Sequence, residues 1–298
     1  MELERVGWGK LLLFGEHSAV QGYPALGMAL PEKVKIKWIP KHKEPWVLSG
    51  EAYTYRHEFN HLKSYIESFF PELKNWGGSL DVISDVPISS GFGSSSALSV
   101  AIAKCMVDFF KLPNKLADIW SLSHQIEKHY HGKPSGIDTA LSLSPGVKRV
   151  VPFIQDNSYY EELKDINYPI VYGSVERTSN TKELVYSVIE QCDRPEGSSI
   201  IKELGFITEE AIQLARSLAS IDSWARLINT AHILLKKLNL GNHQQDKLIQ
   251  EGIKKGAVAG KLSGAGGGGA FYLLFETHEK AKEYYEQLVR QNVTCGLI

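Results

Sequence analysis

Pro87-Ile-Ser-Ser-Gly-Phe-Gly-Ser-Ser-Ser-Ala-Leu98 is a run of glycines and hydroxyls between two segments with regular apolar patterns. Residues 79–85 resemble a partly buried strand, and residues 97–110 keep apolar side chains at helical spacing. This spacing places the helix N-cap within residues 94–96. Glycine lets the backbone approach a ligand, and the free N–H groups and dipole of a helix N-terminus favour an anion. The stretch therefore predicts a phosphate cradle.

A glycine-rich turn with an ordinary serine cap has the same local pattern, so the rest of the chain must decide between the two. The common P-loop is excluded, because no lysine follows these glycines before Lys104, inside the helix. If phosphate binds here, other segments must supply the cationic and catalytic groups.

The chain has 298 residues, of which 43% are hydrophobic, which is enough for two domains. A polar stretch that follows Pro145, Gly146 and Pro152 favours a boundary near residue 165, with domains 1–165 and 166–298. The net charge is −1 and no long basic block is present, so nucleic acid is not an expected partner.

Cys105, Cys192 and Cys295 lie far apart and lack metal-ligand spacing, which favours a reducing cytoplasm. No apolar run approaches the length of about 18 residues that a membrane span needs, and Leu11–Phe14 is too short for a secretory signal. We therefore expect a soluble, unprocessed, cytoplasmic protein without a membrane partner. The sequence does not fix the oligomeric state, and a homodimer is compatible with it.

Charged groups flank the apolar run Leu11–Phe14, which is typical of a buried strand. Lys10 enters this run, and Glu16 and His17 follow it. A rigid strand is a good mount for a polar site. The plain alternative is a solvated lysine and a Glu-His pair in an exposed loop.

Two carboxylates occur close together later in the chain. Glu127 lies near the end of a helix expected over residues 116–130, and Asp138 lies in the Gly- and Pro-containing loop that follows. Such a pair can face one cavity. The neighbouring histidines do not indicate zinc, because no cysteine or further histidine cluster supports them.

Two further segments punctuate the second half. Ser179 or Thr181 precedes a helical pattern and would serve as an N-cap. Lys261-Leu-Ser-Gly-Ala-Gly-Gly-Gly-Gly-Ala270 runs straight into the apolar strand Phe271–Phe275. An interdomain linker fits this loop poorly, because no polar spacer separates it from the strand. Close backbone approach to a ligand or another loop is the better interpretation.

In this order, three segments resemble the signature motifs of the small-molecule kinase superfamily named for galactokinase, homoserine kinase, mevalonate kinase and phosphomevalonate kinase (GHMP). They are Lys10…Gly15-Glu-His17, Pro87…Ala97 and Lys261…Gly269. Within the superfamily, Gly15–Ala25 and His131–Asp138 are most similar to mevalonate kinases. The resemblance spans nearly the whole chain.

The resemblance implies an α+β protein with an N-terminal domain similar to domain 2 of ribosomal protein S5 and a ferredoxin-like C-terminal domain. ATP and Mg²⁺ would bind in the cleft between them, and the small-molecule substrate would be mevalonate. By the same resemblance, Asp138 would accept the substrate hydroxyl proton beside Lys10, and Ser95 with Glu127 would ligate Mg²⁺. A hydroxyl and a carboxylate suit this hard cation.

The resemblance also implies the residues that hold the two substrates. Nucleotide would bind at Gly91, Gly93, Ser94, Ser95 and Ser96, and the phosphate acceptor at Glu16, His17 and Thr181. Trp8 and Phe92 depart from the usual motifs, which have proline and leucine there. Two alternatives therefore stay open: a related kinase acting on another alcohol or sugar, and a non-catalytic nucleotide sensor.

Overall fold

The computed structural model describes residues 2–112, 115–153, 159–179, 181–217 and 219–298, with side chains omitted at 181 and 182. The chain divides into two compact units, each built from three separate segments. The first unit comprises Met1–Lys10, Ala29–Pro87 and Gly93–Pro145, and the second comprises Leu11–Met28, Ile88–Phe92 and Gly146–Ile298. The boundary near residue 165 stays a proposal.

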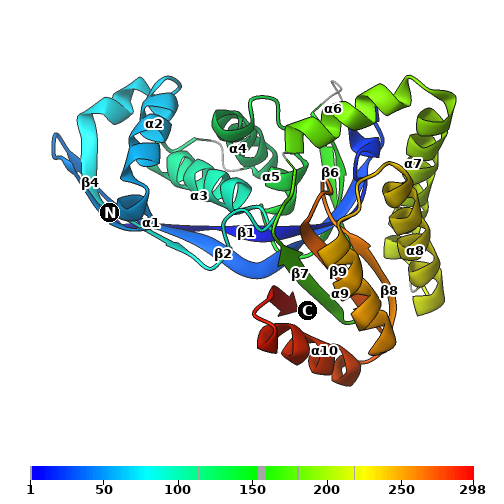
Figure 1. Cartoon of the computed structure of the whole chain (residues 1–298). Coiled ribbons are helices and arrows are strands. Elements are labelled where there is room, and N and C mark those ends of the chain that lie inside the picture. The colour runs from blue at the N-terminus through cyan, green and yellow to red at the C-terminus, as the bar shows by residue number, and fades with distance from the viewer. Residues whose placement is uncertain (1, 113–114, 154–158, 180, 218) are drawn as a thin grey trace. The chain divides into compact units, whose positions relative to one another are not determined.

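The first unit combines strands with helices (Figure 1). Its strands are most of β1 (Leu3–Phe14), most of β2 (Ala25–His42), β3 (Trp46–Gly50) and β4 (Trp76–Ser84). Its helices are α1 (Glu51–Thr54), α2 (Arg56–Glu67), the 3-10 helix η2 (Pro71–Asn75), α3 (Ser94–Phe109), α4 (Leu116–His131) and α5 (Ile137–Leu141).

The second unit holds the remaining elements. Its strands are β5 (Val147–Val151), β6 (Tyr159–Leu163), β7 (Ile170–Val175), β8 (Ala257–Leu262), β9 (Gly269–Phe275) and β10 (Thr294–Leu297). Its helices are the 3-10 helix η1 (Ser18–Gln21), α6 (Thr181–Cys192), α7 (Pro195–Arg216), α8 (Ile221–Lys237), α9 (His243–Lys254) and α10 (His278–Arg290). No helix in the described ranges is both long and apolar enough to cross a bilayer.

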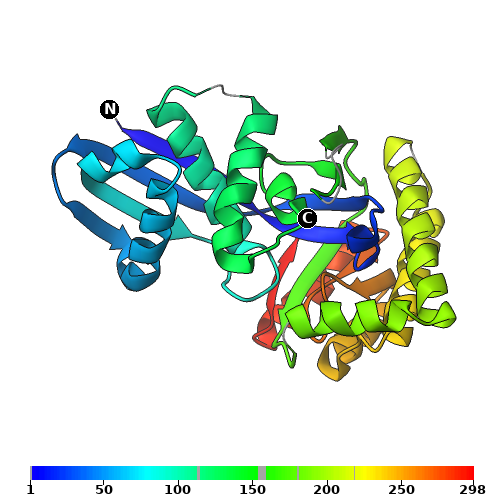
Figure 2. The ribbon, with the colours of Figure 1, turned by 90° about the horizontal axis from the view of Figure 1, so that it is seen from above.

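The second unit contains an antiparallel sheet in the order β10-β7-β9-β8. Figure 2 shows β10 in red beside β7 in green. Helices α6 to α9 connect β7 to β8, and α10 connects β9 to β10. This β-α-β-β-α-β arrangement is that of a ferredoxin-like domain. The expected class of the C-terminal half is confirmed.

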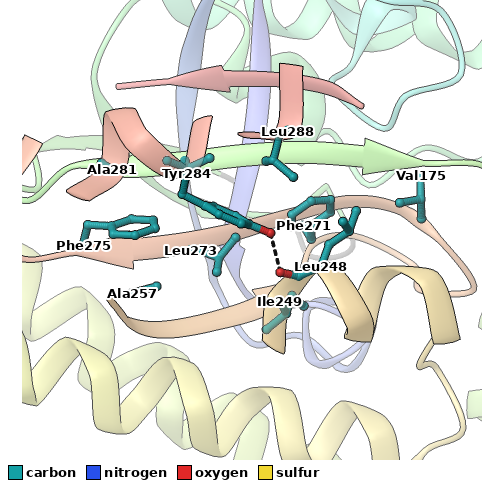
Figure 3. Packing of buried hydrophobic residues seen from close by; sticks show 11 residues of the cluster. Val175, Leu248, Ile249, Ala257, Phe271, Leu273, Phe275, Ala281, Tyr284 and Leu288 are labelled. Carbon is teal, nitrogen blue, oxygen red and sulfur yellow. Dashed lines mark hydrogen bonds between the residues drawn. The ribbon is translucent and has the colours of Figure 1, made fainter. Parts of the chain in front are cut away.

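Apolar side chains fill the space between this sheet, α9 and α10 (Figure 3). Phe271, Leu273 and Phe275 alternate along β9 toward Tyr284 and Leu288 of α10. The Tyr284 hydroxyl donates to the Leu248 carbonyl, so the buried phenol has a partner. Every second residue of a strand lies on one face of the sheet, and residues three or four apart lie on one face of a helix. The apolar residues of β9 and α10 follow these spacings, so each element has one apolar face, and the two faces pack together.

The helix N-cap expected at one of the serines 94–96 is wrong by at least one residue. Gly93 is the N-cap of α3, and Ser94 is its first residue. Gly93 has a φ of 77°, in the left-handed region that side chains rarely adopt. The chain therefore needs glycine at this cap, and the serine hydroxyls are available for other contacts.

Candidate active site

Lys10 and Asp138 form an ion pair in the first unit, with 3.0 Å between Lys10 Nζ and Asp138 Oδ2. The lysine side chain is 8% exposed, whereas that of Asp138 is 47% exposed. Asp138 is the second residue of α5, whose N-cap Gly136 accepts hydrogen bonds from Trp120 and Thr139. A buried ammonium thus lies beside a carboxylate that a small molecule can reach.

The backbone at Gly93 packs directly on the stem of Lys10. A Cβ atom at Gly93 would lie 2.7 Å from both Lys10 Cγ and Ser96 Oγ. The Ser96 hydroxyl donates to the Gly93 carbonyl at 2.9 Å. The start of α3 and the lysine therefore support each other's position.

We expect Gly93→Ala to cost about 1–3 kcal/mol more folding free energy than Gly132→Ala, because its methyl group overlaps Lys10. Gly132 is a matched control, since it also has positive φ, at 67°, but has nothing within 4 Å of its Cβ position. Urea unfolding of both variants measures the difference. Equal losses would show that backbone strain alone matters and that the contact with Lys10 does not.

Glu127 lies 2% exposed at the contact between α3 and α4, which lie side by side in Figure 1. Ser95 donates to its Oε1 at 2.8 Å, and Ser99 donates to its Oε2 at 2.8 Å. His131 Nε2 lies 3.3 Å from Oε1 and 3.2 Å from Ser95 Oγ. Both oxygens of this buried carboxylate are therefore oriented by neighbouring side chains.

Sequence reasoning missed His131 and Ser99 as members of this cluster. The hydrogen bond to Glu127 raises the pKa of His131, and the charge of Asp138 adds to the effect. The signal was available in the spacing, because Glu127 and His131, like Ser95 and Ser99, are four residues apart on one helix. The spacing shows that the two residues of each pair lie on the same face of their helix. It does not show that this face of α3 contacts that face of α4.

Glu16 and Lys261 form an ion pair inside the second unit, with side-chain exposures of 1% and 0%. The Lys261 ammonium also donates to the Leu13 carbonyl at 3.0 Å. Burial raises the pKa of Glu16 and lowers the pKa of Lys261, in each case against the attraction of the partner. The pair joins the loop after β1 to β8, which sequence reasoning did not predict.

His17 is held on the same loop with a φ of 59°. Its Nε2 donates to the Ala265 carbonyl at 3.0 Å, within the glycine-rich loop between β8 and β9. Its buried Nδ1 has no hydrogen-bond partner among the described residues, and burial lowers the pKa of the ring. An uncompensated buried ring nitrogen is the kind of atom that a ligand hydroxyl would satisfy.

The glycine-rich loop is a hairpin connection within the second unit, which excludes the interdomain linker. Gln245 is fully buried on α9 and donates to the carbonyls of Gly269 and Ala270 at 3.2 and 2.7 Å. Thr178 donates from both its amide and its hydroxyl to the Gly267 carbonyl. Hydrogen bonds from α9 and from the segment after β7 therefore fix the conformation of the loop.

The cradle stretch is divided between the units, because Ile88–Phe92 belongs to the second and Gly93 onward to the first. In the second unit, a Cβ at Gly91 would lie 3.1 Å from the Arg177 guanidinium. The Ser174 hydroxyl donates a hydrogen bond to the Ser90 carbonyl at 2.7 Å. Gly91 has a φ of 87°, as a glycine in a close-approach loop requires.

The two departures from the family motifs have separate explanations. Phe92 is 1% exposed and its ring packs edge-on against Tyr172, so its bulk is taken up by the core of the second unit. Trp8 is half-buried in the first unit, where Lys33 Nζ lies 5.6 Å from its ring centroid. Thr181 is the first residue of α6, and its side chain lies outside the described part of the chain.

Within the described ranges, no three side chains drawn from His, Cys, Asp and Glu are arranged to hold a metal ion. The Ser95 hydroxyl and the Glu127 carboxylate nevertheless place oxygen atoms 2.8 Å apart. A hydroxyl and a carboxylate fit Mg²⁺, which binds few protein ligands when phosphate oxygens complete its shell.

Two family profiles match this chain: "GHMP kinases N terminal domain" over residues 60–146 and "GHMP kinases C terminal" over residues 210–294. Together they cover more than half of the sequence. A mevalonate kinase of Methanocaldococcus jannaschii is 29% identical, with 95% of each chain covered.

Two solved structures show how widely the fold is shared. The L. major mevalonate kinase in complex with R-mevalonate has a TM-score of 0.84 at 19% identity, covering 97% of this chain and 92% of that one. The Streptococcus pneumoniae phosphomevalonate kinase has a TM-score of 0.80 at 14% identity, covering 100% and 99%. These likenesses confirm the expected two-domain α+β fold, but the fold does not choose between the two substrates.

Proposed function

Because the chain belongs to the GHMP kinase family, we propose that it transfers the terminal phosphoryl group of ATP to the 5-hydroxyl of mevalonate, giving 5-phosphomevalonate and ADP. The observation that carries the proposal is the contact between the buried Lys10 ammonium and the exposed Asp138 carboxylate. This pair can receive an alcohol and a phosphoryl group together. A sensor without activity would have no need of it.

Asp138 orients the substrate hydroxyl and takes its proton late in the reaction, because phosphoryl transfer passes through a loose transition state that needs little early deprotonation. Lys10 stabilises negative charge beside the transferring group. Its burial keeps the ammonium fixed, so little reorganisation is needed during the reaction.

The backbone N–H groups of Gly91 and of Gly93, Ser94, Ser95 and Ser96 would bind the phosphates of ATP, as the positive end of α3 favours. Ser95 and Glu127 would hold Mg²⁺, which when bound neutralises charge on the phosphate oxygens. His17 and Thr181 would hold the acceptor. Glu16 is buried against Lys261, so we assign it to fix the conformation of the His17 loop.

The location of the protein forms part of the proposal. Cys105, Cys192 and Cys295 are free thiols. Free thiols suit a reducing compartment, and the substrates proposed are small polar metabolites. We therefore propose that the enzyme acts in the cytoplasm.

ADP release with mevalonate, phosphomevalonate, homoserine and galactose tests the function. We expect kcat/KM for mevalonate to exceed the others by about 10²-fold or more, because a site built to hydrogen-bond one substrate leaves polar groups unpaired with another. A higher value for a different acceptor would reassign the substrate within the family. ADP release with none of them, from a protein that binds ATP, would favour the nucleotide sensor.

We expect Glu127→Gln to raise the Mg²⁺ concentration needed for half-maximal activity by about tenfold, because the amide removes the charge that holds the cation. A Mg²⁺ titration of ADP release measures the shift. Glu67→Gln is the matched control, since Glu67 is a buried glutamate paired with Lys63 on α2. An unchanged Mg²⁺ requirement would assign Glu127 a purely structural role between α3 and α4.

A further inference from the structure

Three donor atoms meet where α3 packs on α4, and one of them has no assigned role in the proposed reaction. Ser95 Oγ lies 2.8 Å from Glu127 Oε1 and 3.2 Å from His131 Nε2, and the last two atoms are 3.3 Å apart. All three residues belong to the first unit. The atoms form a nearly equilateral triangle.

Such a triangle has the dimensions of one face of an octahedral metal site. Metal–donor bonds of about 2.1 Å at right angles place neighbouring donors about 3.0 Å apart. The three distances in the structure lie within a few tenths of an ångström of that value. A single ion could therefore contact all three atoms with little side-chain movement.

The surroundings of the triangle favour an ion over a simple hydrogen-bond network. Ser99 donates to the second oxygen of Glu127, which fixes the carboxylate and leaves Oε1 for the triangle. The side chain of Glu127 is 3% exposed, whereas that of His131 is 57% exposed. The ring edge is therefore accessible to an ion from solvent, and the carboxylate charge lies behind it.

We propose that His131 Nε2 is a direct third ligand of the cation held by Ser95 and Glu127, and that it gives the site a preference for Mn²⁺ over Mg²⁺. The inference rests on the cation site of the proposed function. Imidazole suits borderline transition ions, whereas Mg²⁺ prefers oxygen donors. The carboxylate and hydroxyl suit Mn²⁺ as well, so the imidazole is the discriminating donor.

The test uses MnCl₂ alone with the full-length protein at about pH 8. Electron paramagnetic resonance of free Mn²⁺ gives the affinity, and electron spin echo modulation detects nitrogen bonded directly to the bound ion. Competition with MgCl₂ gives the Mg²⁺ affinity. The variants are His131→Gln, Glu127→Gln and, as a matched control on the same helix, His129→Gln, whose ring lies against Tyr65 and Tyr130.

We expect nitrogen modulation in the unmodified protein and in His129→Gln, and its loss in His131→Gln. His131→Gln should weaken Mn²⁺ binding by about tenfold and Mg²⁺ binding by less than about threefold. Circular dichroism checks that this exposed substitution leaves the fold intact.

Two outcomes would overturn the inference in different ways. If bound Mn²⁺ shows no nitrogen modulation but is lost in Glu127→Gln, the cation site of the proposed function stands and His131 is only a hydrogen-bond partner. If Mn²⁺ binding depends on Glu127 neither without ATP nor with it, the inference and the cation site of the proposed function both fail.

Discussion

Replacing Asp138 with asparagine is expected to lower kcat by about 10²–10⁴-fold and to leave the KM for ATP within about twofold. The amide oxygen can still accept the hydrogen bond from Lys10, which lies 3.0 Å from the carboxylate. The amide cannot accept the proton of the substrate hydroxyl. The expected loss is therefore specific to chemistry and not to nucleotide binding. Steady-state kinetics with varied ATP and mevalonate separates the two.

Asp108→Asn is the matched control for this variant, because Asp108 is also a salt-bridged aspartate of the first unit, paired with Arg5 near the end of α3. We expect its kcat to stay within about twofold of the unmodified enzyme, since this partly buried ion pair has no part in the proposed reaction. A near-normal rate for Asp138→Asn would remove Asp138 from the mechanism. An equal loss in both variants would point to a change in the first unit as a whole.

The sequence predicted which helices carry the candidate site, but it predicted the residues at which these helices begin less accurately. The helical patterns over 97–110 and 116–130 correspond to α3 (Ser94–Phe109) and α4 (Leu116–His131). Both have long amphipathic patterns, which are the clearest local signals. The N-cap of α3 differed because the tertiary contact with Lys10 requires glycine there, and no local pattern reports that contact.

Elements with glycine or polar interiors were missed. Strand β8 (Ala257–Leu262) contains Gly260 and Lys261, which are unfavourable in an isolated strand, yet both are buried. The first half of α7 contains Gly205, where a Cβ would lie 2.4 Å from the Tyr23 ring. In both cases a tertiary contact overrides the local preference.

Contacts between segments far apart in the chain were predictable only where the family motifs linked them. Lys10 with Asp138 and Ser95 with Glu127 are such pairs, and both are in contact. Lys261 was quoted within a motif, but its partner Glu16 is 245 residues away. No periodicity or spacing joins them, because their contact is set by how β8 packs beside the loop after β1.

The second large effect is expected from Lys261→Met, which should lower the free energy of unfolding by about 3–5 kcal/mol. The substitution leaves the Glu16 carboxylate buried without a cation in a site where both side chains are almost fully enclosed. Urea unfolding followed by circular dichroism measures the loss. Lys236→Met is the matched control, because its partially exposed pair with Asp246 should contribute only about 0–1 kcal/mol.

Glu16→Gln combined with Lys261→Met should recover most of this loss, because a neutral pair leaves no buried charge uncompensated. The loss in Lys261→Met alone should also shrink as the pH falls. Burial already raises the pKa of Glu16, and removing Lys261 raises it further, so the folded state binds a proton that the unfolded state does not. The folded variant is then stabilised relative to the unfolded chain as the pH is lowered from about 8 toward 5. A loss that is the same at both pH values and in the double variant would mean that Lys261 contributes through its contact with the Leu13 carbonyl and its packing, not through its charge.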